Sequence, residues 1–349
     1  MATTRPPHTS DRARRLLLAG FLVLVAAVLV TRILVMGATA QALVAATSTP
    51  AAAPATESAS SAPLTPEEQA QAKAELTTGK AVVLGLVEGI TEFLPISSTG
   101  HLLVAERIMD IGQTPATKSA ADTYTIAIQI GAILAVVVLY FGRLRRMAEG
   151  AIGKDPGGRR SLVAIAIAFV PAAIVGFIGS QFIEDHLLKV GPVVAAWIVG
   201  ALVIFAFAKR FSSETPGTSL DAITVRQAVI IGAAQCLALW PGTSRSMVTI
   251  LAALLVGLSL SAAIEFSFLL GLLTVSAATA YGLLRHGGDL IDAYGVINPL
   301  IGVVVAFISA VVAVRWMVTY LQRHSLAIFG WYRLVMAALA IGLLASNVI

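Results

Sequence analysis

The sequence predicts an all-α polytopic membrane protein. Of its 349 residues, 57% are hydrophobic and 12% are charged, whereas soluble domains carry about 25% charged residues. Apolar runs of about 20 residues, the length that an α-helix needs to cross a bilayer, recur along the chain. The net charge of +5 fits basic loops on one membrane face, and no basic run with interleaved aromatic residues indicates a nucleic-acid partner. The lone cysteine, Cys236, excludes a disulfide framework.

The first 42 residues are predicted to be either a cleaved signal peptide or an uncleaved signal anchor, an extra N-terminal hydrophobic helix. A basic stretch over residues 1–15 precedes an apolar run from Leu16 to about Met36, and small residues resembling a cleavage site follow. In both cases the basic N-terminus is expected in the cytoplasm. Residues 43–76 are rich in Ala, Ser, Thr and Pro, so we expect a flexible linker there.

The first half of the membrane domain, about 77–210, begins with two short helices. Thr78–Leu94 is too short to span a bilayer and ends at Pro95, and a second short helix follows over about Thr99–Met109. Two short helices around a proline indicate a re-entrant hairpin, which is tolerated only where protein buries it or where it lines a cavity. Three spans are then expected, at about 123–141, 161–183 and 190–208.

The second half, about 225–347, has the same pattern. Val225–Trp240 ends at Pro241, and another short apolar stretch follows over Met247–Leu258. Three further spans are expected, at about 262–284, 297–320 and 326–347. We therefore expect one membrane domain over 77–347, built from two repeats that each contain a re-entrant hairpin and three transmembrane helices.

Charge gives the two repeats opposite orientations. The most basic loop lies between the first two spans and carries its charges at positions 143, 145, 146, 154, 159 and 160. Such a loop belongs in the cytoplasm. Because successive spans cross the membrane in alternating directions, the first half then begins on the outer side and the second half on the cytoplasmic side. The repeats are therefore predicted to be inverted. Inverted repeats with broken helices place a polar site near the midplane, where the two hairpin tips meet.

The first tip contains two carboxylates inside an apolar run. Glu88 and Glu92 are four residues apart and share one face of a helix. If they are buried together, they require either a shared proton or a divalent cation, for which oxygen ligands favour Mg²⁺ or Ca²⁺. The alternative is a solvated pair on a surface helix. Burial of an ionisable group in a membrane segment favours the functional interpretation.

Hydroxyl groups and a histidine follow the break in the first tip. At least one of Ser97, Ser98 and Thr99 is expected to cap the next helix. The same helix N-terminus is a candidate anion site. His101 lies in the first turn of that helix and is a candidate general acid or base. A serine beside such a base is the usual arrangement for an activated nucleophile.

The second tip adds a permanent positive charge. Arg245 lies in a break at membrane depth, where its fork is suited to a phosphate group. Thr243, Ser244 and Ser246 could hydrogen-bond the same anion. Together the tips provide acid and base groups, a hydroxyl nucleophile, a cation site and a phosphate clamp. This set indicates phosphoryl transfer on a lipid-linked phosphate.

Two other polar residues in the spans are secondary candidates. Gln129 is predicted either to form a helix–helix hydrogen bond or to belong to the site. Glu265 is predicted either to pair with an Arg or Gln across the bundle or to belong to the site. For Asp221, a polar residue near the spans, we make no assignment.

The two tip motifs resemble those of a known family. The sequences EGITEFLPISSTGH at 88–101 and QCLALWPGTSRS at 235–246 are similar to the undecaprenyl-diphosphatase, or bacitracin-resistance protein, family. The segments IQIG at 128–131, RQA at 226–228 and EFSFLL at 265–270 resemble it too. The resemblance covers about 77–347. Met247 and Val248 depart from it, since small residues are expected at these two positions.

The resemblance implies a membrane enzyme that hydrolyses undecaprenyl diphosphate to undecaprenyl phosphate and inorganic phosphate. This reaction recycles the carrier lipid for cell-wall synthesis and gives bacitracin resistance. By position, the resemblance implies that Ser98 is the nucleophile or a phosphate ligand, His101 the acid or base and Arg245 the phosphate clamp. It also implies that Glu88 and Glu92 either hold the metal or orient the nucleophile.

The same resemblance places the protein in the bacterial cytoplasmic membrane, with the site open to the extracytoplasmic side. The expected partners are the bilayer and a polyprenyl diphosphate, and a homodimer is one alternative for the oligomeric state. A lipid-phosphate flippase is the alternative function, because inverted repeats with broken helices are also transporter architecture. The hydroxyl, histidine and carboxylate set favours catalysis, since transport needs no nucleophile.

Overall fold

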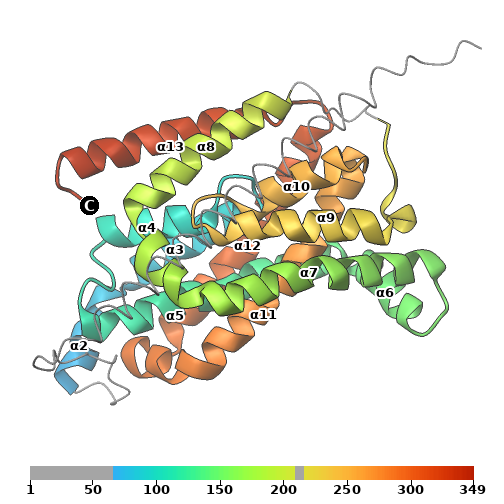
Figure 1. Cartoon of the computed structure of the whole chain (residues 1–349). Helices are drawn as coiled ribbons and strands as arrows, with labels where there is room; N and C mark the ends of the chain where they lie inside the picture. Colours follow the sequence, from blue (N-terminus) through green and yellow to red (C-terminus); the bar gives the residue numbers. More distant parts are fainter. Residues whose placement is uncertain (1–65, 209–215) are drawn as a thin grey trace, which may run out of the picture. The chain divides into compact units, whose positions relative to one another are not determined.

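The computed structural model of the chain describes residues 66–208 and 216–349, and these ranges are helical apart from short connections (Figure 1). The signal peptide or anchor predicted at 1–42 and residues 43–65 of the predicted linker lie outside the described residues. The helices of the first half are α2 (Pro66–Glu75), α3 (Thr78–Thr91), α4 (Ser98–Ile108), α5 (Pro115–Leu139), α6 (Phe141–Ala151), α7 (Pro156–Phe182) and α8 (Val190–Ala208). Those of the second half are α9 (Val225–Gln235), α10 (Arg245–Leu255), α11 (Leu260–Tyr294), α12 (Ile297–Leu321) and α13 (Ala327–Ala345).

Six of the described helices are long and apolar enough to cross a membrane. They cover Thr117–Leu139, Pro156–Leu187, Val190–Ala208, Leu260–Gly288, Ile297–Leu321 and Ala327–Ala345. These ranges coincide closely with the predicted spans, because a run of about 20 apolar residues can satisfy its backbone in a bilayer only as a helix. The prediction of an all-α protein is confirmed for the described residues, and the six predicted spans correspond to six candidate membrane-spanning helices.

Four shorter helices form two hairpins at the predicted positions. In the first hairpin, α3 ends at Thr91 and α4 begins at Ser98 after the break that contains Pro95. In the second, α9 continues into a 3₁₀ turn over Cys236–Leu239, and α10 begins at Arg245. A proline removes a backbone hydrogen-bond donor and restricts the conformation of the residue before it. Each break therefore falls at the proline that predicts it in the sequence.

The two halves interleave rather than pack side by side. The hairpin helix α3 packs against α12 of the other half, and α9 packs against α7 in the same manner. The pairs α5–α11 and α8–α13 also join the halves, and Figure 1 shows α13 beside α8. Glycines make the hairpin contacts close: a Cβ at Gly85 would meet the carbonyl of Gly302, and one at Gly232 would meet the backbone of Ala168.

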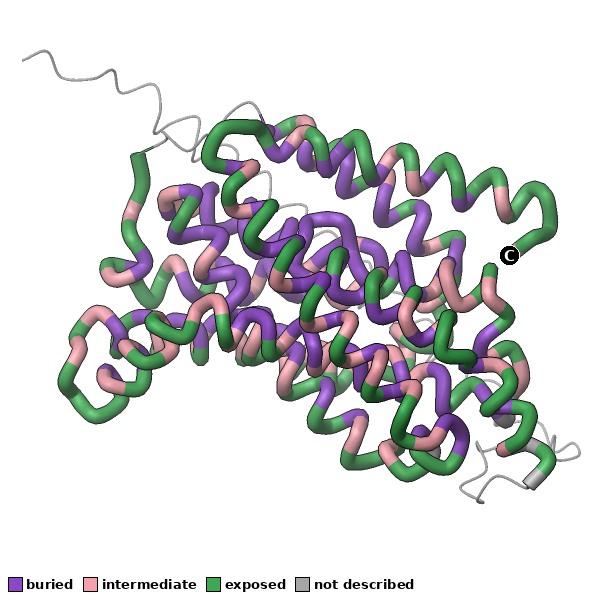
Figure 2. Tube along the Cα trace, turned by 180° about the vertical axis from the view of Figure 1, so that it is seen from behind, coloured by how far each residue is buried: buried purple, intermediate pink, exposed green. Residues whose placement is uncertain are grey.

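Burial is concentrated where the hairpins lie between the spans. Figure 2 shows the buried residues in the interior and exposed residues along the outer sides of the long helices. In the hairpin helix α10 nearly every residue is buried, whereas α13 keeps exposed apolar side chains such as Val335 and Leu339. The apolar exposure of the spans matches a lipid environment, and the buried hairpins match the requirement that broken backbone be covered by protein.

Two helices were not predicted. α2 occupies the last part of the range predicted as a linker and packs against α5 and α11. The Glu75 carboxylate at its end accepts hydrogen bonds from the Gly112 backbone at 3.0 Å and from Thr117 at 3.2 Å. The linker prediction is therefore wrong for residues 66–75. α6 occupies most of the basic loop between the first two spans.

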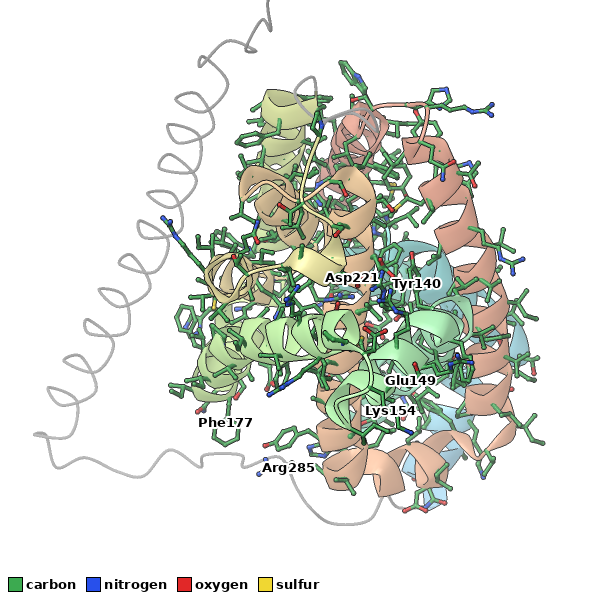
Figure 3. The ribbon with its side chains drawn as sticks, turned by 90° about the vertical axis from the view of Figure 1, so that its right-hand side faces the viewer. Tyr140, Glu149, Lys154, Phe177, Asp221 and Arg285 are labelled. Carbon is green, nitrogen blue, oxygen red and sulfur yellow. The ribbon has the colours of Figure 1, made fainter. Side chains whose placement is uncertain are left out.

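The basic α6 end of the molecule is held by ion pairs, and Figure 3 labels Asp221, Tyr140 and Glu149 at this end. Arg143 binds Glu265 of α11 at 2.7 Å and also pairs with Asp221, which precedes α9. Arg146 binds Asp155 at 2.7 Å and Asp221 at 3.0 Å. Hydrogen bonds from Arg146 lower the pKa of Asp155 to about 2. The network ties α6 of the first half to the start of the second.

Candidate active site

The two hairpin tips are in direct contact. Ser246 of the second tip donates a hydrogen bond to the Leu94 carbonyl of the first at 2.9 Å, and Ser244 donates to the same oxygen at 3.4 Å. All three residues are buried. The predicted meeting of the tips is therefore present in the structure, and Ser244 and Ser246 join the tips through their hydroxyl groups.

The tips share an unusual backbone conformation. Ser97 has φ 76° and ψ 102°, and Ser244 has φ 73° and ψ 111°. Each serine is the N-cap residue of the second helix of its hairpin. A positive φ is costly for a residue with a Cβ, and such strain is found preferentially at functional sites. The repetition of this conformation in both halves marks equivalent positions of the two tips.

Glu92 connects the tips electrostatically. One of its carboxylate oxygens, Oε1, binds Nη2 of Arg245 at 3.0 Å. The other, Oε2, accepts a hydrogen bond from the Ser98 hydroxyl group. The Arg245 and Glu92 side chains are only 12% and 8% exposed. A charge pair this far from water is much stronger than one at a surface, so the three side chains hold one another in a fixed geometry.

Arg245 is oriented by its surroundings. Its guanidinium carbon lies 5.5 Å from the centroid of the Phe93 ring, and Nη1 donates to the Ser267 carbonyl at 3.3 Å. Gly271 of α11 leaves the space that the guanidinium fills, because a Cβ built there would collide with it. The second tip therefore supplies a cation whose position depends on the first tip and on α11.

The N-terminus of α4 carries no side-chain cap. Ser97 is at the N-cap position, but its side chain forms no capping hydrogen bond, while Thr99 is exposed and Ser98 bonds to Glu92. The predicted cap by one of these three residues is therefore wrong. In contrast, the Ser244 hydroxyl accepts a bond from the Met247 amide and caps α10. The backbone N–H groups of the first turn of α4 lack a side-chain cap, which is a property of helical anion sites.

His101 lies beside the tip but is engaged elsewhere. Its Nδ1 lies 2.6 Å from the Ser97 carbonyl, and its Nε2 lies 3.0 Å from the Tyr332 hydroxyl group. The ring packs against Trp197 and Tyr332. Among the described residues, no hydrogen bond joins His101 to Ser98, Glu92 or Arg245. Glu92 thus connects Ser98 with Arg245. His101 is bound instead to the Ser97 carbonyl and to Tyr332.

Glu88 is a buried carboxylate with unsatisfied oxygens. It is fully buried, and neither of its carboxylate oxygens has a hydrogen-bond partner in the described part of the chain. It is close enough to Glu92 and Arg245 to interact with both electrostatically. A buried carboxylate without donors requires a cation or a proton. The unpartnered oxygens beside Glu92 therefore fit a hard cation, although the described residues contain no group of three or more His, Cys, Asp or Glu side chains arranged for a metal.

The secondary candidates have structural partners. The Gln129 side-chain oxygen of α5 accepts a hydrogen bond from Thr279 of α11 at 2.9 Å, which is the helix–helix bond of the first alternative. Glu265 pairs with Arg143 through both of its oxygens, at 2.7 and 3.0 Å. Neither side chain contacts Ser98 or Arg245 within the ranges that the structure describes.

Arg333 is a central residue that the sequence analysis missed. It is fully buried in α13, and in the described part of the chain its guanidinium donates to backbone carbonyls. The acceptors belong to Pro95 in the first tip, Gly242 and Thr243 in the second tip, and Ala196 and Trp197 in α8. An arginine within a predicted span was the available signal, because such a charge must be paired with something inside the protein. Arg333 therefore fastens both tips to α8.

A known protein family matches most of the chain. The family described as bacitracin resistance protein BacA matches residues 81–339, which include both tips and Arg333. The chain belongs to the bacitracin resistance protein BacA family. The match begins after α2, so this helix and the preceding residues are outside the matched region.

Several curated proteins named undecaprenyl-diphosphatase are similar to the chain. The chain is 43% identical over 267 residues to the undecaprenyl-diphosphatase of Sorangium cellulosum (strain So ce56), covering 75% of this chain and 85% of the relative. It is 39% identical to the enzyme of the same name from Rhodopseudomonas palustris (strain BisB18), covering 76% of this chain and 97% of the relative. The corresponding enzyme of Clostridium novyi (strain NT) is 40% identical over 77% of this chain and 96% of its own length.

Proposed function

We propose that this protein is an integral membrane phosphatase that hydrolyses undecaprenyl diphosphate to undecaprenyl phosphate and inorganic phosphate. The proposal rests chiefly on the contact of Glu92 with both Ser98 and Arg245, which joins a hydroxyl nucleophile, a base and a phosphate-binding cation from two tips. The activity name of the relatives supports the substrate. The reaction recycles the carrier lipid for cell-wall synthesis and gives resistance to bacitracin.

The terminal phosphate binds between the tips. Arg245 neutralises its charge, and the backbone N–H groups at the start of α4, together with Ser97 and Thr99, bind its oxygens. Ser244 and Ser246 contribute mainly by holding the second tip against Leu94, since their hydroxyl groups donate to its carbonyl. Positioning and charge neutralisation supply most of the catalysis in phosphoryl transfer.

Ser98 is the nucleophile and Glu92 is its base. As the Ser98 oxygen bonds to the terminal phosphorus, Glu92 takes the hydroxyl proton along the existing hydrogen bond. The bond from phosphorus to the bridging oxygen breaks, and undecaprenyl phosphate leaves. Water then hydrolyses the phosphoserine and releases inorganic phosphate. His101 positions the first turn of α4 through the Ser97 carbonyl.

A divalent cation, Mg²⁺ or Ca²⁺, would be held by Glu88 and Glu92. Its chemistry would be to neutralise charge on the phosphate oxygens. The unpartnered oxygens of buried Glu88 support this assignment. Exhaustive chelation followed by addition of each ion tests it: full activity in the chelated protein would remove the cation from the mechanism.

A groove beside the tips suits the polyprenyl tail. It has a volume of about 770 Å³ and an almost entirely apolar lining from α3, α12 and α13. It reaches the first tip at Leu94 and Ile96 and also includes Tyr332, the hydrogen-bond partner of His101. A tail in this groove would place its diphosphate at the tips.

The fold is a pair of inverted repeats in the cytoplasmic membrane, with the site open to the extracytoplasmic side. The reciprocal packing of α3 on α12 and of α9 on α7 supports an internal two-fold relation. The matching conformations of Ser97 and Ser244 support it as well. The basic residues around α6 favour a cytoplasmic location for that end.

Phosphate release from undecaprenyl diphosphate by purified protein tests the function. The wild-type protein should release phosphate, and Ser98→Ala should lower the rate by about 100-fold or more. Ser161→Ala is the control, because Ser161 is also buried but its hydroxyl bonds to the Gly157 carbonyl in α7. No release by the wild-type protein, together with movement of the intact lipid across vesicles, would favour the flippase alternative.

A further inference from the structure

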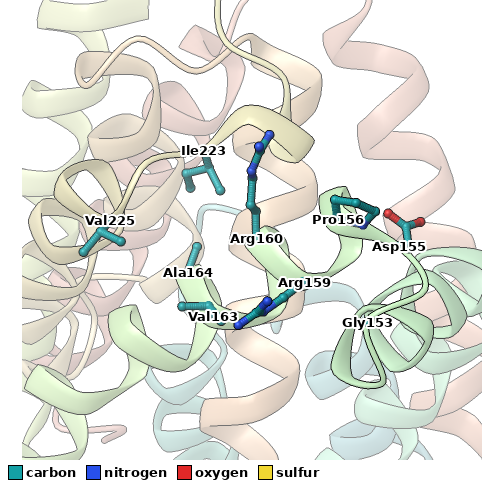
Figure 4. Close-up of a pocket in the computed structure, with 9 residues that line it drawn as sticks. All are labelled: Gly153, Asp155, Pro156, Arg159, Arg160, Val163, Ala164, Ile223 and Val225. Carbon is teal, nitrogen blue, oxygen red and sulfur yellow. The ribbon is translucent and has the colours of Figure 1, made fainter.

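A second pocket lies where α7 and α9 begin (Figure 4). Its volume is about 450 Å³. None of its lining residues belongs to a hairpin tip. Two of them, Arg159 and Arg160, are in the first turns of α7, where the candidate span starts. The pocket therefore lies at the edge of the apolar part of the helix, at a distance in sequence from every residue of the proposed active site.

The two arginines have no acidic partner. Within 66–208 and 216–349, neither Arg159 nor Arg160 forms an ion pair with a carboxylate, and both side chains belong to exposed residues. Arg160 donates only a long hydrogen bond, at 3.4 Å, to the Asp221 backbone carbonyl. Both guanidinium groups therefore lie at the pocket without an ion-pair partner among the described residues.

The acidic side chains beside the pocket already have arginine partners. Asp155 lines the pocket, but its carboxylate binds Arg146 at 2.7 Å and also accepts from the Gly158 amide at 2.8 Å. Asp221 is bound by Arg143 and Arg146. The exposed guanidinium groups of Arg159 and Arg160 therefore remain available to a negatively charged group from outside the chain.

The other walls of the pocket are apolar. They comprise Val163 and Ala164 of α7, Ile223 before α9, and Val225 at its start. Figure 4 shows Arg160 extending toward Ile223 and Arg159 lying beside Val163. A positively charged rim above an apolar wall fits a molecule with an anionic head and an apolar body. A free phosphate would leave the apolar wall uncovered.

We propose that the pocket binds the headgroup of an anionic bilayer phospholipid. The phosphate diester accepts hydrogen bonds from Arg159 and Arg160, whose forked guanidinium groups suit phosphate oxygens. The glycerol backbone and the first acyl carbons lie along Val163 and Val225. Basic pockets between transmembrane helices recognise anionic headgroups by the same combination of charge and apolar contact. This inference concerns a lipid that is not a substrate and is independent of the phosphatase assignment.

Native mass spectrometry of the full-length protein, titrated with phosphatidylglycerol, tests the proposal. The double variant Arg159→Gln/Arg160→Gln should bind phosphatidylglycerol about tenfold more weakly than wild type. The control Arg145→Gln/Arg323→Gln removes the same charge from exposed residues outside the pocket and should bind as wild type does. Phosphatidylcholine, which has a phosphate but no net charge, should bind weakly to all three proteins.

Three results would overturn the proposal. One is unchanged phosphatidylglycerol affinity in the pocket variant, and another is an equal loss in both double variants, which would indicate a general charge effect. The third is displacement of the lipid by millimolar inorganic phosphate, which would reassign the arginines to a free anion. Phosphate release from undecaprenyl diphosphate in detergent should be the same for both double variants, which verifies that they fold.

Discussion

Among single residues, Glu92 has the largest consequence because its two carboxylate oxygens contact different tips. Its bond to Arg245 fixes the cation proposed to bind the phosphate, and its bond from Ser98 orients the hydroxyl group. Glu88, one helical turn earlier, has no hydrogen-bond partner among the residues that the structure describes. The two glutamates thus have different roles although their spacing makes them look equivalent in sequence.

The space at Gly271 gives a residue-scale prediction. Gly271→Ala places a methyl group where the Arg245 guanidinium lies and should lower phosphate release by about 10- to 100-fold, since small misplacements of catalytic groups are costly. The loss cannot come from helix propensity, because alanine favours a helix over glycine by about 1 kcal/mol. Gly342→Ala in α13 is the control, since nothing lies within 4 Å of a Cβ built there. Equal activity of the two variants would contradict the proposed role of Arg245.

Arg333 gives a second residue-scale prediction. Arg333→Leu leaves backbone carbonyls of both tips without their donor, so the free energy of unfolding should fall by about 2 kcal/mol or more. Thermal unfolding in detergent should show a lower Tm, and phosphate release should fall because the tips are no longer fastened to α8. Arg315→Leu on the exposed side of α12 should change neither quantity. An unaltered Tm in Arg333→Leu would show that the tips do not depend on this residue.

Among the elements, the hairpins matter because they are short and buried between the long helices. Their proline breaks expose polar backbone, which Arg333 and the serines satisfy. The spans supply the surrounding apolar walls, and α3, α12 and α13 leave a groove that ends at the first tip. In the proposed function, the groove and the tips together form one elongated site for an amphiphilic substrate.

Blocking the groove should act on the tail of the substrate. Val312→Trp on the α12 wall should lower kcat/KM for undecaprenyl diphosphate by about tenfold while affecting a short prenyl diphosphate little, because the short tail does not reach the blocked segment. Val199→Trp on α8 is the matched control, an exposed valine outside the groove. Equal effects of Val312→Trp on long and short substrates would place the tail elsewhere.

For the whole molecule, much of the architecture is readable from the sequence. Hydropathy locates all six spans and the prolines locate both hairpins, because these features depend on local composition. The helices α2 and α6 are polar and short, so no apolar run indicates them. The missing α4 cap and the partners of His101 depend on the positive φ of Ser97 and on contacts more than 200 residues apart, such as that with Tyr332. Pattern alone could not supply them.

The proposed inverted topology predicts which loops face outward. In a Cys236→Ala background, single cysteines at Lys189 and Val296 should react with an impermeant maleimide in intact cells, and those at Lys154 and Arg323 should react only after lysis. These positions are in exposed connections between spans. The same loop assignment makes α5 and α11 run in opposite directions across the membrane. Labelling of the cysteine at Lys154 in intact cells would show that the orientation is the reverse of the one proposed. Labelling of the cysteines at Lys189 and Lys154 from the same side would show that the helix between them does not cross the membrane.

The claim that two tips form one catalytic site is tested most directly by a double-mutant cycle of phosphate release from undecaprenyl diphosphate. Ser98→Ala and Arg245→Ala should each lower the rate by about 100-fold or more, and the double variant should be no slower than the slower single variant, because groups acting as a unit are not additive. If the two losses multiply in the double variant, the residues act independently, and the account of a shared site joined by Glu92 is contradicted.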